Sequence, residues 1–389
     1  MSGRVYSSLR RPRPTCYDAS VPQPAAFLAC LLDHALNHGL PARRRGGPVL
    51  AVIGRHGLAP PVLATLLRGL PRRRSDRADR IVASMQAAWP VLAERSTRLT
   101  AEAPPLSLLE VGRSASRIVF LFGSEPFPLL VAKFPRGETA PTVREAEMLE
   151  RVAVAGLAPR ALGTVGGAWV QEGLPGLPAR VDPVSSRTAG RMPWTSREEQ
   201  LSAALTRLAS STAHLGSTEE YLLQPLDRAL DHPYPQADLR LLRAARNDLR
   251  RLRVVAVQHK DLSAQNWMVD DSRFVGLVDW EKAVPDGIPG FDDLHVAVAA
   301  VEHGVGLTRW SDHEVVASFR EAWTSSPLFA GARAGARESA RAAGVPEALL
   351  EPLEVAFFAR RLGRRLTGSS LRHLDVGSVA QMLSVVCRP

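Results

Sequence analysis

The sequence predicts an α+β fold in which a small β-rich part precedes a larger, mostly helical part. Apolar runs separated by a Gly-Ser turn between residues 106 and 134 are typical of paired strands. From residue 195 onward, apolar residues recur at helical spacing in several long segments. A polar cluster between Val254 and Glu281 lies among short apolar runs, and it indicates what the chain does.

This cluster places Asp261, Asn266 and Asp279 at the ends of short predicted strands, with His259 two residues before Asp261. The spacing Asp-x4-Asn-x12-Asp supplies one carboxylate to orient and deprotonate an attacking hydroxyl, and two oxygen ligands for Mg²⁺ on nucleotide phosphates. We therefore expect Asp261 to be the catalytic base, Asp279 the main metal ligand and Asn266 the second. Any one of them alone is an ordinary turn residue, but the three at this spacing favour a kinase.

The motif HKDLSAQN followed by VDWE resembles the pattern of the aminoglycoside phosphotransferase and choline kinase superfamily. The resemblance extends over residues 104–325. It implies a protein-kinase-like two-lobed fold, with a small β-rich lobe over 104–173 and a mostly helical lobe over 174–389. It also implies ATP or GTP as phosphate donor, Mg²⁺ as cofactor and a small-molecule hydroxyl as acceptor. Protein kinases carry D-F-G where this chain has Asp279-Trp280-Glu281, so a protein kinase proper is not favoured.

The first hundred residues differ from the rest in charge. They contain 16 arginines and 5 acidic residues, a net charge of +11, whereas the remainder has a net charge of −1. This contrast predicts a boundary near residues 100–105, with residues 1–103 forming a basic extension. The extension is expected to be partly folded, with a strand over 49–53 and a helix over 78–92.

Two arginine clusters, at residues 43–45 and 72–74, carry much of this charge. Such clusters can bind an anionic partner, although a solvated surface is their commoner role. No nucleic-acid motif or interleaved aromatic residues accompany them, so nucleic acid is not an expected partner.

Small residues lie in the turn of the strand–turn–strand segment over 106–122. Gly112 and Ser114 would let backbone N–H groups approach phosphate oxygens, so we expect this turn to contact the nucleotide. The turn lacks the pattern G-x-G-x-x-G, and a plain hairpin explains it equally well by itself.

Lysine is rare in this chain: of the 49 basic residues, only Lys133, Lys260 and Lys282 are lysines. A lysine that survives so strong a bias toward arginine is expected to be needed as a lysine. Lys133 lies in the apolar run 129–134, which is similar to the kinase strand whose lysine contacts the α and β phosphates. The alternative is a lysine at a strand edge that meets only solvent.

Twelve residues after Lys133, apolar residues at helical spacing predict a helix over 144–152. The family places on this helix a glutamate that pairs with the strand lysine. Glu145 precedes Leu149 by four residues, in agreement with the family pattern E-x-x-x-L, and is favoured over Glu147. Either glutamate could instead be a charge on a solvated helix face.

The segment AWVQEGLPG at residues 168–176 resembles the connection between the two lobes in this family. The resemblance implies that the adenine bonds to the carbonyl of Glu172 and to the amide of Leu174. The glycines and the proline that follow Glu172 would end the strand and begin the crossing to the second lobe.

The larger lobe is predicted to be mostly helical. Thr195 to Glu199 form a capping box, which opens a helix whose apolar stripe ends at Thr212 and Leu215. Further helices are expected over 237–252 and 294–303.

Asp293, directly before the helix over 294–303, resembles a family residue that braces the catalytic loop, and helix capping is its simpler role. The helices from Pro346 onward are rich in arginine, with Arg360, Arg361, Arg364 and Arg365 close together.

Composition sets the broad class. The chain of 389 residues is long enough for two or three domains, and 45% of its residues are hydrophobic. Its three cysteines are too scattered for a disulfide framework or a metal site. It starts without an apolar segment of signal-peptide type and contains no run of 18 apolar residues. A cytoplasmic location, without a transmembrane segment, is therefore expected.

The acceptor is only broadly limited by the sequence. An aminoglycoside is a polycation, and its site should gather carboxylates late in the chain, yet residues 351–389 hold six arginines and three acidic residues. This favours a neutral or anionic acceptor, such as a sugar, a glycoside or a nucleoside or antibiotic-like molecule. Choline would require an aromatic cage.

The sequence thus predicts an ATP- or GTP-dependent kinase that phosphorylates a small-molecule hydroxyl. The alternative is a catalytically silent kinase fold that serves as a scaffold and docks through its basic N-terminal region. The presence of Lys133, Glu145, Asp261, Asn266 and Asp279 together favours the enzyme.

Overall fold

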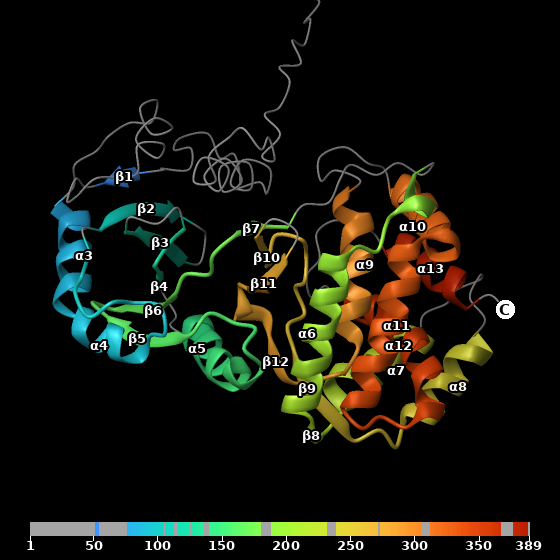
Figure 1. The fold of residues 1–389 in the computed structure, drawn as a ribbon. Helices are drawn as coiled ribbons and strands as arrows, with labels where there is room; N and C mark the ends of the chain where they lie inside the picture. The colour runs from blue at the N-terminus through green and yellow to red at the C-terminus, as the bar shows by residue number, and fades with distance from the viewer. Residues whose placement is uncertain are drawn as a thin grey trace, which may run out of the picture.

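Two lobes lie side by side along the long axis of the molecule (Figure 1). One is built on an antiparallel sheet and the other is mostly helical, which confirms the predicted protein-kinase-like α+β fold. The computed structural model describes residues 51–53, 76–104, 106–112, 116–123, 127–135, 140–179, 188–231, 239–270, 273–304, 312–366 and 376–387.

A six-stranded antiparallel sheet forms the small lobe, with the strand order β1-β2-β3-β4-β6-β5. Because side chains alternate across a strand, β4 buries Leu130 and Ala132 on one face and presents Lys133 on the other, toward helix α5 (Ala140–Val152). The strands are β1 (Ala51–Ile53), β2 (Ser107–Gly112), β3 (Ser116–Phe122), β4 (Leu130–Pro135), β5 (Ala161–Val165) and β6 (Ala168–Glu172).

Helices α3 (Asp76–Ala87) and α4 (Trp89–Arg95) cover the other face of this sheet. Their apolar side chains share one hydrophobic cluster with residues of five strands: Ile81, Val82, Met85, Trp89 and Leu92 pack with Leu108, Val119, Leu121, Leu130, Ala132, Leu162 and Val170. Helices on the N-terminal side of the predicted boundary at residue 103 thus share a buried core with the strands beyond it. A contrast in surface charge reports on solvent exposure, whereas buried contacts hold a domain together.

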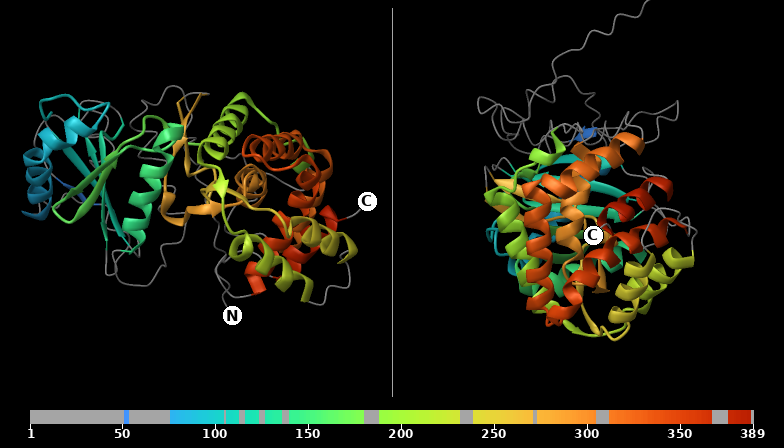
Figure 2. Two further views of the ribbon diagram at one scale, coloured as in Figure 1. Left: turned by 90° about the horizontal axis from the view of Figure 1, so that it is seen from below. Right: turned by 90° about the vertical axis from the view of Figure 1, so that its right-hand side faces the viewer.

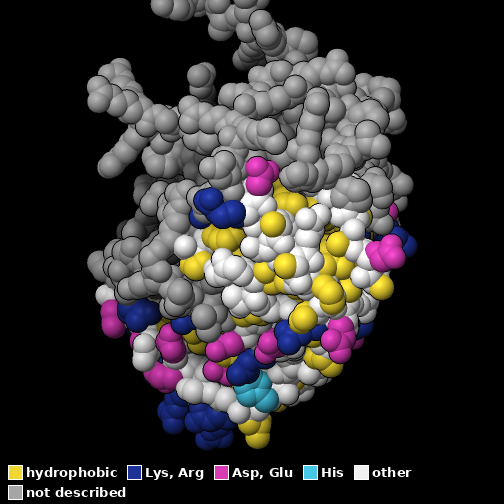
Figure 3. All heavy atoms as spheres, turned by 90° about the vertical axis from the view of Figure 1, so that its left-hand side faces the viewer, with side chains coloured by type: hydrophobic (Ala, Val, Ile, Leu, Met, Phe, Trp, Pro, Cys, Tyr) yellow, Lys and Arg dark blue, Asp and Glu magenta, His cyan; other side chains and the backbone are white. Residues whose placement is uncertain are grey.

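The predicted helix over 78–92 is two helices in the structure, which meet at Ala88. Pro90 stands in the first turn of α4, where its missing N–H does no harm, although it would disrupt the interior of a longer helix. Of the strand predicted over 49–53, residues 51–53 form β1. Both arginine clusters of the N-terminal region, 43–45 and 72–74, lie outside the described residues. On the face of the small lobe shown in Figure 3, acidic and basic side chains are interspersed.

Helices make up most of the larger lobe (Figures 1 and 2). The capping box predicted at Thr195 is present and opens α6. Leu215 lies outside that helix, in the short strand β8, so the predicted stripe extended three residues, or less than one turn, beyond the end of α6. The helices are α6 (Ser196–Thr212), α7 (Gln224–Asp231), α8 (Leu239–Leu249), α9 (Phe291–Gly304), α10 (Asp312–Ser325), α11 (Pro327–Ala342), α12 (Leu350–Leu366) and α13 (Val376–Val386).

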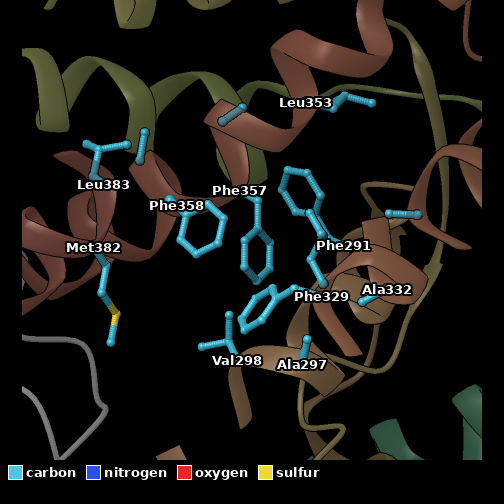
Figure 4. Packing of buried hydrophobic residues seen from close by; sticks show 14 of the residues in the cluster. Phe291, Ala297, Val298, Phe329, Ala332, Leu353, Phe357, Phe358, Met382 and Leu383 are labelled. Atoms are coloured by element: carbon cyan, nitrogen blue, oxygen red, sulfur yellow. The ribbon is translucent and has the colours of Figure 1, made fainter. Parts of the chain in front are cut away.

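The core of the larger lobe is rich in phenylalanine (Figure 4). Phe291 of α9 meets Phe357 of α12 edge to face, with ring centroids 5.3 Å apart, and Phe358 meets Phe357 in the same way at 5.0 Å. Such contacts add to the free energy gained by burial. The core therefore fixes α9 and α12 relative to each other, and α9 carries Asp292, which contacts the site described below.

Two three-stranded sheets lie between the small lobe and these helices (Figure 1). One has the order β11-β10-β7, and the other the order β12-β9-β8. Their strands are β7 (Leu177–Pro178), β8 (His214–Leu215), β9 (Val254–Gln258), β10 (Trp267–Asp270), β11 (Arg273–Leu277) and β12 (Val284–Gly287). None of the helices in the described part of the chain is long and apolar enough to span a membrane.

Replacement of Trp89 by alanine tests whether α4 belongs to the core of the small lobe. Trp89 is fully buried, and its indole N–H donates to the carbonyl of Thr100 at 2.9 Å. Loss of this side chain is expected to lower the free energy of unfolding by about 3–5 kcal/mol, measured by urea denaturation. The matched control is Val91→Ala on the exposed side of the same helix, which should change it by less than about 0.5 kcal/mol. Equal effects of the two changes would contradict the shared core.

Candidate active site

Lys133 brings the two lobes together. Its ammonium lies 2.5 Å from the carboxylate of Glu145 on α5 and 3.7 Å from that of Asp279 in the larger lobe. Lys133 and Glu145 are both almost completely buried, whereas Glu147 is exposed. The ion pair favoured by the helix spacing is thus present, and the alternative of a solvent-facing lysine is not what the structure shows.

Asp261 and Asn266 lie in the loop between β9 and β10, which is called the catalytic loop below. The side-chain amide of Asn266 donates to the backbone carbonyl of Asp261 at 2.7 Å. The backbone carbonyl of Asn266 accepts from the amide of Val278 at 2.8 Å. Because the amide nitrogen of the side chain is engaged, its oxygen is the atom that can face a cation. The first of these bonds shapes the loop, and the second holds the segment before Asp279 against it.

His259 ties the catalytic loop to the Asp279 segment a second time. Its Nε2 lies 2.9 Å from the carbonyl of Val278, so it donates there, and its ring packs against Trp280 with centroids 4.6 Å apart. The side chain is fully buried. His259 therefore positions the backbone next to Asp279 and is not placed to take a proton from a substrate.

Lys282 contacts the proposed catalytic base. Its ammonium donates to Oδ2 of Asp261 at 2.8 Å. Burial lowers the pKa of Lys282, but the charge and the hydrogen bond of Asp261 outweigh it, so the pKa is raised and the side chain stays a cation. Sequence reasoning assigned no role to Lys282, although the rarity of lysine in this chain was a signal that could have marked it.

The catalytic loop is braced by Asp292 and not by Asp293, which corrects the expectation from the sequence. The carboxylate of Asp292 accepts from the backbone amides of His259 at 2.6 Å and Lys260 at 3.0 Å, and from the side chain of Gln258 at 3.4 Å. Both aspartates lie in the first turn of α9, where one residue rotates a side chain by about 100°. Asp292 consequently faces β9 and the loop, and Asp293 faces the helices behind it.

Asp293 accepts hydrogen bonds from Ser202 of α6 at 2.7 Å and from Ser339 of α11 at 2.9 Å. It is buried, and burial raises its pKa to about 7, against the opposing effect of the two serine hydroxyls. This carboxyl group thus joins three helices behind the site, and its side-chain bonds among the described residues are to Ser202 and Ser339 and not to the catalytic loop.

The predicted connection between the lobes is held by the segment that follows α4. The carboxylate of Glu172 accepts from the hydroxyl of Ser96 at 2.5 Å and from the amide of Thr97 at 2.8 Å. Arg98 donates to the carbonyl of Gly173. The polypeptide then crosses to the larger lobe through Gly176, whose φ of 94° is accessible to glycine at little cost.

The remaining predicted nucleotide contacts lie near the turn between β2 and β3. Gly112 ends β2 and pairs with Arg117 of β3. Ser114 lies outside the described residues. Leu174, whose amide was expected to bond to adenine, follows Gly173 and is partly exposed.

The oxygens of Asp279 and Asn266 fit a magnesium ion. They are hard ligands, and Mg²⁺ commonly takes one or two protein oxygens, the rest of its shell being phosphate and water. Across the described ranges, no group of three or more His, Cys, Asp and Glu side chains is arranged to hold a metal ion. Two protein ligands next to Lys133 suit an ion that arrives with nucleotide phosphates.

A two-lobed fold with this set of residues between the lobes defines a small-molecule phosphotransferase. A model of the phosphotransferase enzyme family matches residues 106–338, which is more than half of the chain. The chain therefore belongs to the phosphotransferase enzyme family.

Several solved structures resemble the chain, and none of the curated proteins matches it. Ethanolamine kinase from Plasmodium vivax has 11% identity and a TM-score of 0.41, over 86% of this chain and 96% of that one. Aminoglycoside phosphotransferase APH(2'')-Ib bound to ADP has 13% identity and a TM-score of 0.37, over 77% and 97%. Macrolide 2'-phosphotransferase MphH from Brachybacterium faecium has 16% identity and a TM-score of 0.36, over 79% and 98%.

Asp292→Ala should destabilise the protein, because it leaves two buried backbone amides of the catalytic loop without their acceptor. Each unsatisfied donor costs about 1–3 kcal/mol, so the free energy of unfolding should fall by about 2–6 kcal/mol in urea denaturation. Asp286→Ala on β12 is the control and should have a much smaller effect, because this side chain is 43% exposed and contacts only the equally exposed His214 among the ion pairs of the described residues. A small effect at Asp292 would show that the loop holds its shape without this carboxylate.

Asp293 gives the stability of the protein a pH dependence that Asp293→Asn should remove. Its folded-state pKa of about 7 lies above the ordinary value of 3.8, so the folded protein binds this proton more tightly than the unfolded chain. The resulting stability is complete below pH 4 and is lost as the pH rises through 7. In urea denaturation, the free energy of unfolding of Asp293→Asn minus that of wild type should therefore be larger at pH 8 than at pH 5. An unchanged difference between the two pH values would contradict this assignment.

Proposed function

We propose that this protein transfers the γ-phosphoryl group of Mg-ATP or Mg-GTP to a hydroxyl of a small molecule, such as a sugar, a glycoside or a nucleoside or antibiotic-like compound. The observation that carries the proposal is the position of Lys133, held by Glu145 at 2.5 Å and set 3.7 Å from Asp279. A buried ammonium between a fixed glutamate and a second carboxylate suits the phosphates of a nucleotide whose metal ion is held by that carboxylate.

Nucleotide binding uses groups from both lobes in this proposal. Lys133 contacts the α and β phosphates, and Asp279 and the side-chain oxygen of Asn266 would hold Mg²⁺, which neutralises phosphate charge when bound. The backbone of Glu172 and Leu174 bonds to the base, and the turn at Gly112 and Ser114 covers the phosphates. The Ser96 and Thr97 contacts to Glu172 support this assignment because they fix the backbone that would meet the base.

Phosphoryl transfer forms a bond between the acceptor oxygen and the γ-phosphorus and breaks the bond from that phosphorus to the β–γ bridging oxygen. Asp261 orients the acceptor hydroxyl and takes up its proton. Its carboxylate is one-quarter exposed, so a substrate can reach it, and Lys282 holds one of its oxygens at 2.8 Å. Positioning contributes much of the effect because the transition state is loose and needs little early proton abstraction.

The first test is nucleotide binding. Thermal shift measurements with Mg-ATP and Mg-GTP should stabilise the wild-type protein, and Asp279→Ala should abolish the Mg²⁺-dependent part of that shift. Asp270→Asn, at the exposed end of β10, is the matched control and should behave as wild type. Absence of any shift for wild type would favour the alternative of a catalytically silent scaffold.

Asp261→Asn separates chemistry from binding. Since its carboxylate is assigned to the acceptor, nucleotide affinity should be unchanged while single-turnover transfer slows by about 10²–10⁴-fold. Asn266→Ala should weaken Mg-nucleotide binding as well, because its oxygen is assigned to the metal. Full turnover in Asp261→Asn with any competent acceptor would remove Asp261 from its proposed role.

A further inference from the structure

A group of cations lies beside the catalytic loop, apart from the nucleotide contacts. Lys260 directly precedes Asp261, and Arg360 and Arg364 come from α12; these three residues are called the cationic cluster. The ammonium of Lys260 lies 5.0 Å from the ring centre of Tyr221, on the π-helical turn Glu219–Leu223. Burial lowers the pKa of Lys260 to about 7, and the charges of Arg364 and Arg360 add to this effect.

Arg360 is buried without the partners that a buried guanidinium needs. Its side chain is 4% exposed and lies over the ring of Phe291. Within the part of the chain that the structure describes, its Nε and Nη2 have no hydrogen-bond partner. A buried charge that lacks partners is costly, so this arrangement needs a reason.

The carboxylates around the cluster leave Nε and Nη2 of Arg360 without a hydrogen bond among the described residues. The charge of Asp292 acts on Lys260 and Arg360, but its oxygens accept from the backbone amides of His259 and Lys260. The charge of Glu220 acts on Lys260 as well.

Other arginines of the same region do have acidic partners. Arg361, next to Arg360 on α12, donates to Glu302. Arg333 and Arg337 both donate to Glu354 at 2.8 Å. The fold can thus satisfy an arginine on α12 or against it, and Arg360 stands out because its Nε and Nη2 remain without such bonds among the described residues.

The backbone conformation of Lys260 is a second indication that the cationic cluster binds something. Lys260 has a φ of 68°, and of the described non-glycine residues only Asp279 shares a positive φ. Glycine adopts this conformation at little cost, whereas a lysine is strained in it. The other two lysines of the chain contact Glu145, Asp279 and Asp261. A strained lysine in so arginine-rich a chain is best explained by what its side chain binds.

We propose that the cationic cluster is an anion-binding subsite and that the acceptor is a hydroxyl compound bearing a phosphate or a carboxylate. This inference rests on the proposed function and narrows its acceptor. Guanidinium groups match the geometry of both oxyanions. Since Lys260 and Asp261 are adjacent residues, an anionic group at the cluster places a hydroxyl of the same small molecule near the base.

Titration calorimetry with inorganic phosphate tests the subsite without any acceptor or nucleotide, and acetate provides the carboxylate arm. Lys133→Met serves as the background, because phosphate can also bind at the nucleotide contacts. On that background, Lys260→Gly, which also relieves the backbone, and Arg360→Met should each weaken anion binding by at least about tenfold. Arg341→Gln, an exposed arginine on α11 that pairs with Glu347, is the control and should bind as the background protein does.

Thermal unfolding separates a binding role from a structural one. Removal of a poorly partnered buried charge should leave the melting temperature of Arg360→Met unchanged or raised, while phosphate binding is lost. If Arg360→Met unfolds, Lys260→Gly alone decides the matter. Phosphate and acetate binding that is abolished by Lys133→Met, or is unaffected by Lys260→Gly, would overturn the subsite.

A transfer assay with matched acceptors then identifies the anion. Glucose, glucose 6-phosphate, gluconate and kanamycin offer neutral, phosphorylated, carboxylated and cationic hydroxyl compounds. Preference for glucose 6-phosphate or gluconate that falls at least about tenfold in Lys260→Gly supports the inference. If wild type uses glucose or kanamycin as well as it uses the anionic acceptors, and Lys260→Gly keeps the same pattern, the inference is overturned and the proposed kinase function stands. Failure to bind nucleotide counts against the kinase function alone, because the phosphate titration decides the subsite independently.

Discussion

A single buried carboxylate, that of Asp292, is the constraint on which the site depends. It accepts the backbone amides of His259 and Lys260 and so fixes the turn that aims Asp261. Burial raises its pKa, against the opposing effect of His259 and of the amides that donate to it. Because α9 is anchored in the phenylalanine core of the larger lobe (Figure 4), the position of the catalytic loop is set by helix packing and not by the loop itself.

The second constraint acts across the lobes. Lys133 is fixed by Glu145 within the small lobe and approaches Asp279 of the larger one. The segment after α4 holds the connection between the lobes through Glu172 and Gly173. The two helices before it complete the core of the small lobe. Residues 76–104 consequently shape the proposed nucleotide site, although the motifs of the chain all lie beyond them.

Asp261 adjoins two lysines and lies close to further charged side chains. Lys282 donates a hydrogen bond to the carboxylate of Asp261, and Lys260 is the residue that precedes Asp261 in the chain. Asp279 and Asn266 are the proposed metal ligands, whereas Arg360 and Arg364 are contributed by α12. A small anionic acceptor would thus be held by the protein at one end and meet the nucleotide at the other. The arginine-rich C-terminal helices had already favoured a neutral or anionic acceptor in the sequence.

From the sequence by itself, strand alternation and helical periodicity predicted a β-rich part followed by a helical part, because both are local properties of the chain. The resemblance of its motifs to a known family implied the two-lobed fold and the pairing of Lys133 with Glu145. The spacing of Asp261, Asn266 and Asp279 is equally local, and their roles remain predictions. Only the tertiary structure decided that Asp292 and not Asp293 braces the loop, that Lys282 contacts Asp261, and that α3 and α4 belong to the small lobe. The physical reason is that each of these depends on which side of a helix meets which distant segment. One residue of helix rotation, or a contact made 75 residues away as between Arg98 and Gly173, leaves no mark in a local pattern.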